Sequence, residues 1–207
     1  MGVGINNYKC IVFDFDMTLV NTELGSIYCY KKAIRKAGGV FEEKNVYKYM
    51  GEFLDKTYER IENPLITEKE FEELFYYYSH KKMAVMSHLY PEVRTVLNEL
   101  KKTHILAIVT NKDMLCVEQI MKIHNIDLSI FSCIISCDEV SERKPHPQGL
   151  ELCMEKIGVF PEQCLYVGDS ANDMIFAENA KVKGIRIIRD GNMISNNNVI
   201  CELSNLL

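Results

Sequence analysis

The fold is decided by the stretch Cys10-Ile11-Val12-Phe13-Asp14-Phe15-Asp16-Met17-Thr18-Leu19-Val20. It begins with an apolar run, Cys10 to Phe13, whose β-branched and aromatic residues predict a buried strand. Two carboxylates, Asp14 and Asp16, follow at the carboxyl end of that strand. Because ligands bind outside the carboxyl ends of the strands in an open parallel sheet, this strand end is a candidate metal and phosphate site.

The spacing of the two acids is informative in its own right. Side chains two residues apart on an extended strand point to the same side, so Asp14 and Asp16 can face one reacting group. One member of such a pair can act as nucleophile and metal ligand while the other holds a proton to donate. The alternative is a solvated strand end that carries two surface acids.

Length and composition describe an ordinary globular chain of 207 residues. A formal charge of −5 argues against a general nucleic-acid surface, which needs clustered Lys and Arg. Small anionic substrates stay open, because a bound metal can outweigh the global charge. The longest apolar runs have the length of strands, so we expect no membrane partner.

Cysteine usage bears on the compartment. The eight cysteines allow a disulfide framework, but the chain shows no signal peptide and several cysteines lie inside apolar runs. We therefore expect free buried thiols in a reducing compartment and a cytoplasmic protein. The five histidines are scattered and no Cys-x-x-Cys pair occurs, which makes a structural zinc site a poor prediction.

The order of elements predicts an α/β chain with an insertion. Apolar residues recur at helical spacing from Thr22 to His88, where Thr22 is an expected N-cap and Thr67-Glu68-Lys69-Glu70 resembles a capping box. After residue 90, strands alternate with helices, which indicates a doubly wound parallel sheet. We expect a core formed by residues 1–20 and 89–207 and an all-helical domain formed by residues 21–88.

Residue types suited to phosphate chemistry follow four of the predicted elements. They are Asp14 with Asp16, then Thr110 with Asn111, then Lys144, and then Gly168-Asp169-Ser170 with Asp173. In this order and spacing they resemble the motifs of the haloacid dehalogenase superfamily of phosphohydrolases, in the group of phosphoglycolate phosphatases and β-phosphoglucomutases. The resemblance covers nearly the whole chain, and the helical block resembles the α-helical cap that this superfamily inserts into its Rossmann-like core.

The resemblance implies a reaction and a cofactor. Asp14 would attack phosphorus and form an aspartyl phosphate, and Asp16 would protonate the leaving alcohol and then deprotonate the attacking water. Mg²⁺ would be held by Asp14, Asp169 and the backbone carbonyl of Asp16.

It also implies a set of binding residues. Thr110, Asn111, Lys144 and Thr18 would bind the substrate, with Lys144 also acting in catalysis. Asp173 and Ser170 would hold these binding residues in position without contacting the substrate themselves. Taken singly, each of these residues is compatible with a purely structural role, as a loop residue, a solvated charge or a helix cap.

Two positions depart from the family pattern, since Met17 stands where most members have Gly and Asn21 where an acid is common. We predict a Mg²⁺-dependent phosphatase for a small phosphorylated metabolite such as phosphoglycolate, a sugar phosphate or a nucleotide, and we expect a monomer. A phosphoglucomutase is disfavoured because Ser26 stands where a mutase would have His. A receiver-like signalling module or a non-catalytic phosphate-binding protein remains the alternative from another class.

Overall fold

The computed structural model describes residues 4–50, 53–189 and 198–207, and the chain divides into two compact units. The α/β unit comprises Met1–Val20, Leu89–Met114 and Asn125–Leu207, and the helical unit comprises Asn21–His88 and Leu115–His124. The expected core included all of residues 89–207, whereas Leu115–His124 belongs here to the helical unit. That the two units act as catalytic core and cap stays a prediction.

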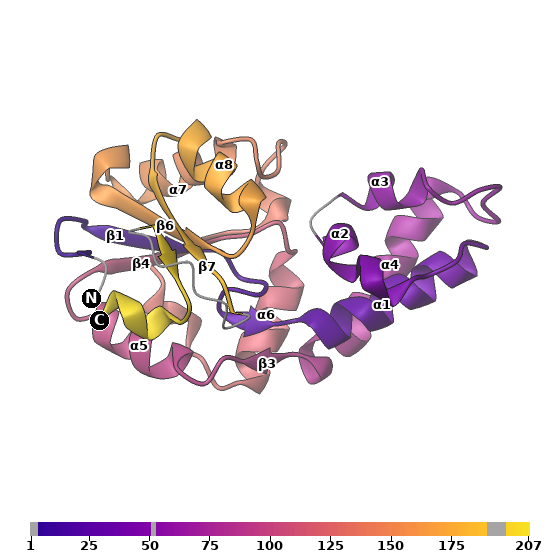
Figure 1. Cartoon of the computed structure of the whole chain (residues 1–207), viewed down its shortest axis with the longest axis horizontal. Helices are drawn as coiled ribbons and strands as arrows, with labels where there is room; N and C mark the ends of the chain where they lie inside the picture. Colours follow the sequence, from indigo (N-terminus) through magenta and orange to yellow (C-terminus); the bar gives the residue numbers. More distant parts are fainter. Residues whose placement is uncertain (1–3, 51–52, 190–197) are drawn as a thin grey trace. The chain divides into compact units, whose positions relative to one another are not determined.

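The α/β unit is built on a six-stranded sheet with the strand order β5-β4-β1-β6-β7-β8 (Figure 1). Every neighbouring pair in this sheet is parallel. Read along the sheet, the strands are third, second, first, fourth, fifth and sixth in the chain, which is the doubly wound order. The predicted fold class is confirmed. The strands are β1 (Cys10–Phe13), β4 (Ile105–Val109), β5 (Cys133–Ile135), β6 (Cys164–Gly168), β7 (Lys183–Ile187) and β8 (Val199–Ile200).

Helices cover both faces of this sheet (Figure 1). One face packs against α7 (Gln148–Ile157) and α8 (Ala171–Asn179), and the other against α5 (Val93–Leu100). Alternate strand residues point to the α7 and α8 side, as the period of a strand requires. The buried residues on that side include Cys10, Val12, Ala107, Val109, Cys164, Tyr166, Leu150, Cys153, Phe176 and Ala177.

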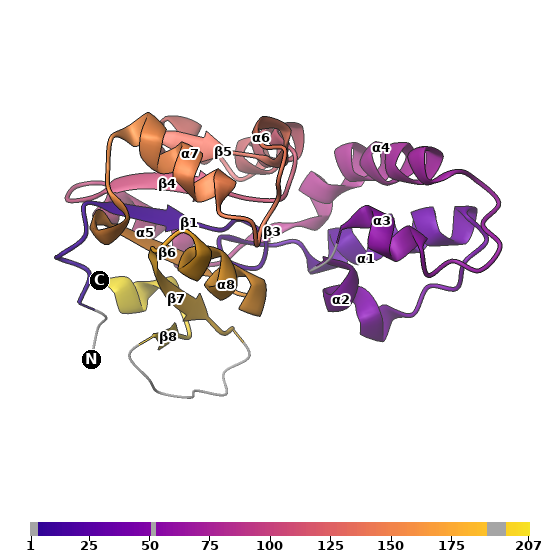
Figure 2. The same ribbon diagram turned by 90° about the horizontal axis from the view of Figure 1, so that it is seen from above.

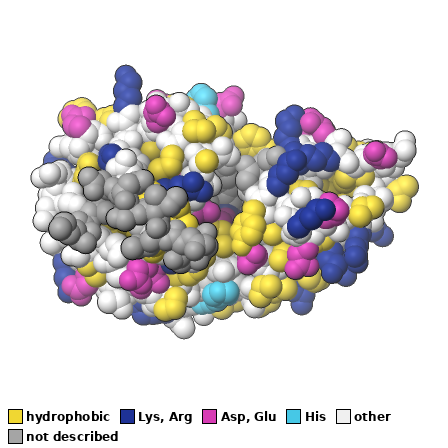
Figure 3. Space-filling view, in the orientation of Figure 1, with side chains coloured by type: hydrophobic (Ala, Val, Ile, Leu, Met, Phe, Trp, Pro, Cys, Tyr) yellow, Lys and Arg dark blue, Asp and Glu magenta, His cyan; other side chains and the backbone are white. Residues whose placement is uncertain are grey.

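The helical unit consists mainly of two long helices with shorter ones beside them (Figure 2). Helices α1 (Glu23–Lys36) and α4 (Glu68–Met86) approach closely at Gly25, where an added Cβ would lie 2.5 Å from the sulfur of Met83. The other helices are α2 (Val46–Met50), α3 (Leu54–Tyr58) and most of α6 (Met114–Ile123). Figure 3 shows basic, acidic and apolar side chains mixed on the displayed face of this unit.

The helix starts in this unit test two predictions. Thr67 caps α4 with a full capping box, because Glu70 N–H donates to its side chain while the Glu70 carboxylate accepts from Thr67 N–H, as predicted. Thr22 occupies the N-cap position of α1, but its side chain makes no capping bond. The side chain of Asn21 makes a bond to the first turn instead, because its Oδ1 accepts from the Glu23 N–H at 3.0 Å.

The chain crosses between the units at two short strands, β2 (Val20–Asn21) and β3 (His88–Leu89), which pair with each other. Within the described ranges, no helix is both long and apolar enough to span a membrane. All eight cysteines are free thiols, and Cys201 is partly buried whereas the others are buried.

Candidate active site

Three strand ends place the predicted site residues along one edge of the sheet. Strand β1 lies between β4 and β6 and is in register with both. Asp14, Thr110 and Asp169 directly follow these strands, so all three leave the sheet at the same edge. The strand order reverses at this point, which is where ligands bind in open α/β sheets.

Lys144 reaches this edge from the loop that precedes α7. The side chain of Asn111 holds its backbone, since Asn111 Oδ1 accepts from Lys144 N–H at 3.0 Å and Asn111 Nδ2 donates to Lys144 O at 3.3 Å. The ammonium lies 2.5 Å from Asp14 Oδ1 and 2.8 Å from Asp173 Oδ1. Burial alone would lower the pKa of Lys144, but the Asp14 and Asp173 carboxylates raise it well above its usual value, so Lys144 stays charged.

Asp173 has its acceptor sites filled. Its Oδ1 accepts from Lys144 and from the Tyr166 hydroxyl, while its Oδ2 accepts from the Ser170 N–H at 3.0 Å and the Ser170 hydroxyl at 2.6 Å. Burial would raise the pKa of Asp173, but Lys144 and Ser170 lower it below its usual value. Asp173 therefore completes the capping box of α8, whose N-cap is Ser170, and it also holds Lys144, so a structural and a functional interpretation of this residue both apply.

The carboxylates at this edge favour a cation. Asp14, Asp169 and Asp173 each offer an oxygen, and these atoms lie within 4.8 Å of one another. Burial raises the pKa of Asp14 well above its usual value against the opposing effect of Lys144, and burial together with the Asp173 charge raises the pKa of Asp169 to about 7. A divalent cation would offset this burial and repulsion, and clustered carboxylate oxygens suit a hard ion, so these residues fit a metal.

Asp16 lies beside a lysine that the sequence analysis did not select. Lys112 Nζ is 3.1 Å from Asp16 Oδ1, and the Lys112 side chain is only 10% exposed. The backbone N–H of Lys112 also donates to the Thr110 hydroxyl oxygen at 3.1 Å. Lys112 thus links Asp16 to the end of β4.

The loop after β1 completes the site. The Thr18 hydroxyl, fully buried, donates to Asp14 Oδ2 at 3.2 Å. Met17 N–H donates to Val20 O at 2.7 Å, and Met17 has a positive φ of 58°. The family pattern has Gly at this position because Gly reaches such angles without steric cost.

The structure brings the predicted residues together at this edge of the sheet. Asp14, Thr18, Lys144, Asp173 and Ser170 are joined by direct hydrogen bonds, Asn111 through the Lys144 backbone, and Asp16 and Thr110 through Lys112. Asp169 lies beside Asp14 and Asp173. The catalytic roles of these residues stay predictions.

The residues in or beside this network that were missed include Lys112, Tyr166 and Arg189. Lys112 follows a predicted motif directly, so its position was the signal that could have identified it. Tyr166 lies inside an apolar strand pattern, which predicts only a residue of the hydrophobic core. Arg189, whose Nη2 donates to Thr18 O at 2.6 Å, has no motif around it.

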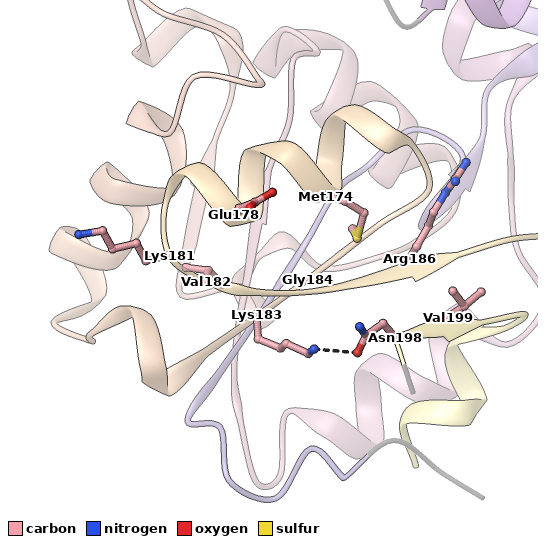
Figure 4. A pocket seen from close by; sticks show the side chains of 9 residues that line it. All are labelled: Met174, Glu178, Lys181, Val182, Lys183, Gly184, Arg186, Asn198 and Val199. Atoms are coloured by element: carbon pink, nitrogen blue, oxygen red, sulfur yellow. Dashed lines mark hydrogen bonds between the residues drawn. The ribbon is translucent and has the colours of Figure 1, made fainter. Parts of the chain in front are cut away.

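A cavity of about 740 Å³ lies elsewhere in the α/β unit, along α8, β7 and β8 (Figure 4). Its basic side chains do not converge, because Lys181 and Arg186 point away from each other in Figure 4. Lys183 pairs with Asn198 at 2.7 Å, and Arg186 Nε donates to the backbone oxygen of Asp169 at 2.9 Å. Arg186 therefore supports the Asp169 loop from outside the carboxylate cluster.

Comparison with known proteins agrees with this geometry. The family model for haloacid dehalogenase-like hydrolases matches residues 11–187. The chain belongs to this family. It is 33% identical over 191 residues to a phosphoglycolate phosphatase of Vibrio cholerae, covering 85% of this chain and 82% of that protein. It is 27% identical over 179 residues to pyrophosphatase PpaX of Bacillus mycoides, covering 86% and 82%.

A solved structure shows the same fold. A Bacteroides fragilis protein described as haloacid dehalogenase-like superposes with a TM-score of 0.85 at 23% identity, covering 97% of this chain and 100% of that one. The predicted family and the prediction of a haloacid dehalogenase-like enzyme that hydrolyses phosphoric monoesters are confirmed.

Proposed function

We propose that this haloacid dehalogenase-like phosphatase is Mg²⁺-dependent and hydrolyses a small phosphomonoester through an aspartyl phosphate on Asp14. The observation that carries the proposal is the position of Asp14. Its carboxylate lies at the strand-order reversal, 2.5 Å from the Lys144 ammonium and 3.2 Å from the Thr18 hydroxyl. A carboxylate held in this way is oriented for attack before substrate arrives.

Two displacements make up the reaction. An Asp14 oxygen forms a bond to phosphorus, the ester P–O bond breaks, and Asp16 gives its proton to the leaving alkoxide. Water then attacks the phosphorus, Asp16 takes the water's proton, and the bond between Asp14 and phosphorus breaks to release phosphate. Asp16 suits the proton transfers because it follows Asp14 by two residues and its side chain is 27% exposed, so it can meet an incoming ester.

Donors at the sheet edge bind the phosphoryl oxygens. The Thr110 hydroxyl accepts from the Lys112 N–H, which leaves its own proton to donate to phosphate. The Asn111 backbone and the charge of Lys144 complete a preorganised site for the anionic group. The Asn111 side chain acts differently, since it holds the Lys144 backbone.

Asp14, Asp169 and the backbone carbonyl of Asp16 would hold the Mg²⁺. When bound, the ion would neutralise the carboxylates and the charge of the phosphoryl group. Asp173 is assigned a supporting role, because each of its oxygens already accepts two hydrogen bonds, whereas each Asp14 oxygen accepts one.

The helical unit is assigned to substrate selection, as a cap formed mainly by residues 21–88. The phosphatase and pyrophosphatase names of the relatives support a small phosphorylated substrate. Phosphoglycolate, a sugar phosphate, a nucleotide and pyrophosphate form the set to screen. A phosphatase is favoured over a mutase because Ser26, at the position of the mutase His, is only 4% exposed.

Hydrolysis of an aryl phosphate tests the proposal. We expect release with Mg²⁺, loss of release with EDTA, and a loss of at least about 10³-fold in Asp14→Asn because the nucleophile is gone. Glu178→Gln is the matched control, since it removes a charge from an exposed position of α8 and should leave the rate unchanged.

Two results would contradict the proposal. Turnover retained by Asp14→Asn would remove the assigned nucleophile. No release from the aryl ester or from any of the screened phosphates would favour a non-catalytic phosphate-binding role. The intermediate has its own test, because acid-quenched Asp16→Asn should retain phosphate on Asp14, as read by mass spectrometry.

A further inference from the structure

Tyr166 places a buried hydroxyl inside the predicted catalytic network. It lies on β6 with its side chain toward α7 and α8, and it is 0% exposed. Its hydroxyl donates to Asp173 Oδ1 at 2.9 Å and accepts from Lys144 Nζ at 3.0 Å. Its ring packs edge-to-face against Phe176 with 5.3 Å between the centroids, which fixes the direction of the hydroxyl.

The hydroxyl completes the hydrogen bonding of Lys144. A lysine ammonium has three N–H donors, and here they point to Asp14, Asp173 and Tyr166. A buried donor without an acceptor is costly, so the Tyr166 oxygen determines where the third N–H points. Burial and the Asp173 charge raise the pKa of Tyr166 well above its usual value, which keeps the hydroxyl protonated and able to donate to Asp173.

The partners of Lys144 change during the proposed reaction. When the Asp14 carboxylate becomes an acyl phosphate, its own oxygens lose their charge and the negative charge lies on the phosphoryl oxygens, so the Asp14 contact no longer holds the ammonium in its original place. Asp173 keeps its charge, and both Asp173 and the neutral Tyr166 hydroxyl keep their hydrogen-bonding capacity throughout. They are therefore the contacts that can hold the ammonium in place beside the phosphoryl group.

We propose that Tyr166 is a positioning residue of the phosphatase reaction, and that its hydroxyl fixes the Lys144 ammonium while Asp14 gains and loses the phosphoryl group. This inference rests on the proposed function. It assigns Tyr166 no contact with substrate, and it requires the hydroxyl rather than the ring.

Tyr166→Phe isolates the hydroxyl, because Phe keeps the ring contact with Phe176 and with the Lys144 ammonium 5.8 Å from the ring centre. We expect kcat for an aryl phosphate to fall about tenfold, with KM changed by less than about twofold, since the loss acts on the reacting state. Inhibition by orthovanadate, which imitates the transferring phosphoryl group, should weaken by about the same factor, while inhibition by inorganic phosphate stays unchanged.

Tyr30→Phe is the matched control. Tyr30 is 5% exposed, and its hydroxyl donates to Tyr49 O at 2.7 Å inside the helical unit. Its loss should affect stability in the way that the loss of any buried hydroxyl does, and it should leave kcat and vanadate inhibition unchanged. Equal effects of the two variants on kcat would overturn the positioning role.

A double-mutant cycle tests, without turnover, the contact between Tyr166 and Lys144 on which the inference depends. In urea unfolding, Tyr166→Phe should shift the midpoint less in a Lys144→Met background than in the wild type, because the ammonium that it pairs with is already gone. Additive shifts would overturn the inference even if no substrate is hydrolysed. An active wild type with an unaffected Tyr166→Phe would also overturn it and would leave the proposed function standing. A wild type that hydrolyses none of the screened phosphates would overturn the proposed function and, with it, the role of Tyr166 in that reaction.

Discussion

Met17 holds a left-handed backbone conformation, with φ at 58°, in the loop that carries the predicted nucleophile. For a residue with a Cβ this conformation costs roughly 1–2 kcal/mol. We expect Met17→Gly to be more stable to urea than Met17→Ala by about 1 kcal/mol, since both remove the Met side chain beyond Cβ and only Gly also removes the strained Cβ. If Met17→Ala is the more stable of the two, the loop is not strained at Met17.

Residues in short motifs could be predicted, and residues that act through distant partners could not. Asp14, Thr110 and Asp169 are visible because each directly follows an apolar strand pattern. Tyr166 and Arg189 lie 22 and 171 positions from their partners Lys144 and Thr18, and nothing local marks either pairing. Lys144 itself was identified through the family resemblance, because a lone lysine in a loop is normally a solvated charge.

At the scale of elements, Arg189 joins segments that the chain brings from far apart. Its guanidinium bonds Glu92 Oε1 at 2.7 Å and Thr18 O at 2.6 Å, and it stacks 3.5 Å from the Tyr90 ring centre. The same Glu92 oxygen accepts from Leu203 N–H at 3.3 Å. This ion pair therefore joins four segments, which are the loop after β1, the start of α5, the segment after β7 and the C-terminal 3₁₀ helix Leu203–Leu206.

This ion pair predicts a pH dependence of stability. Burial would raise the pKa of Glu92, but hydrogen bonding to Arg189 lowers it below its ordinary value of 4.5. A depressed folded-state pKa stabilises the fold above pH 4.5, and that stabilisation is lost as pH falls through the lower, folded-state value. Glu92→Gln should therefore lower the urea midpoint at pH 7, and its difference from wild type should shrink as pH falls below about 4.5.

Glu99→Gln is the control for this experiment, because Glu99 pairs with Lys102 on the exposed side of α5 and is 48% exposed. Exposed pairs contribute little, so this variant should match wild type at each pH. A Glu92→Gln difference that stays constant down to acid pH would show that the carboxylate charge is not what stabilises this junction.

Helices and strands could be predicted from the sequence where their pattern of apolar residues extends over several residues. Strands β1, β4 and β6 appear as apolar runs, and α4 as a helical period with its capping box. Strand β8 has two residues, Val199 and Ile200, which is too short for any alternation to show. The 3₁₀ helix Leu203–Leu206 likewise depends on packing against α5 rather than on local pattern.

At the scale of the whole molecule, the helical insertion could be predicted because no strand pattern interrupts residues 22–88. The assignment of Leu115–His124 could not, since it depends on contacts between distant segments. Cys116 Sγ lies 3.0 Å from Ser79 Oγ, and His124 Nε2 lies 3.1 Å from Ser87 O. Sequence order assigns these residues to the core, whereas their contacts place them in the helical unit.

Metal binding should change the stability of the whole chain. Without a cation, the partly buried Asp169 lies near Asp14 and Asp173, so the folded state carries their repulsion. Mg²⁺ that binds only the folded state should raise the melting temperature by about 5 to 10 °C at a hundredfold excess over its Kd. Asp169→Asn removes both the repulsion and a ligand, so it should melt above wild type in EDTA and show a much smaller rise with Mg²⁺.

Glu178→Gln should follow wild type in both conditions, since Glu178 is exposed on α8. A calorimetric scan of the three proteins decides this, because an equal rise in Asp169→Asn would place the ion elsewhere, and no rise in wild type would remove the metal from the proposed mechanism.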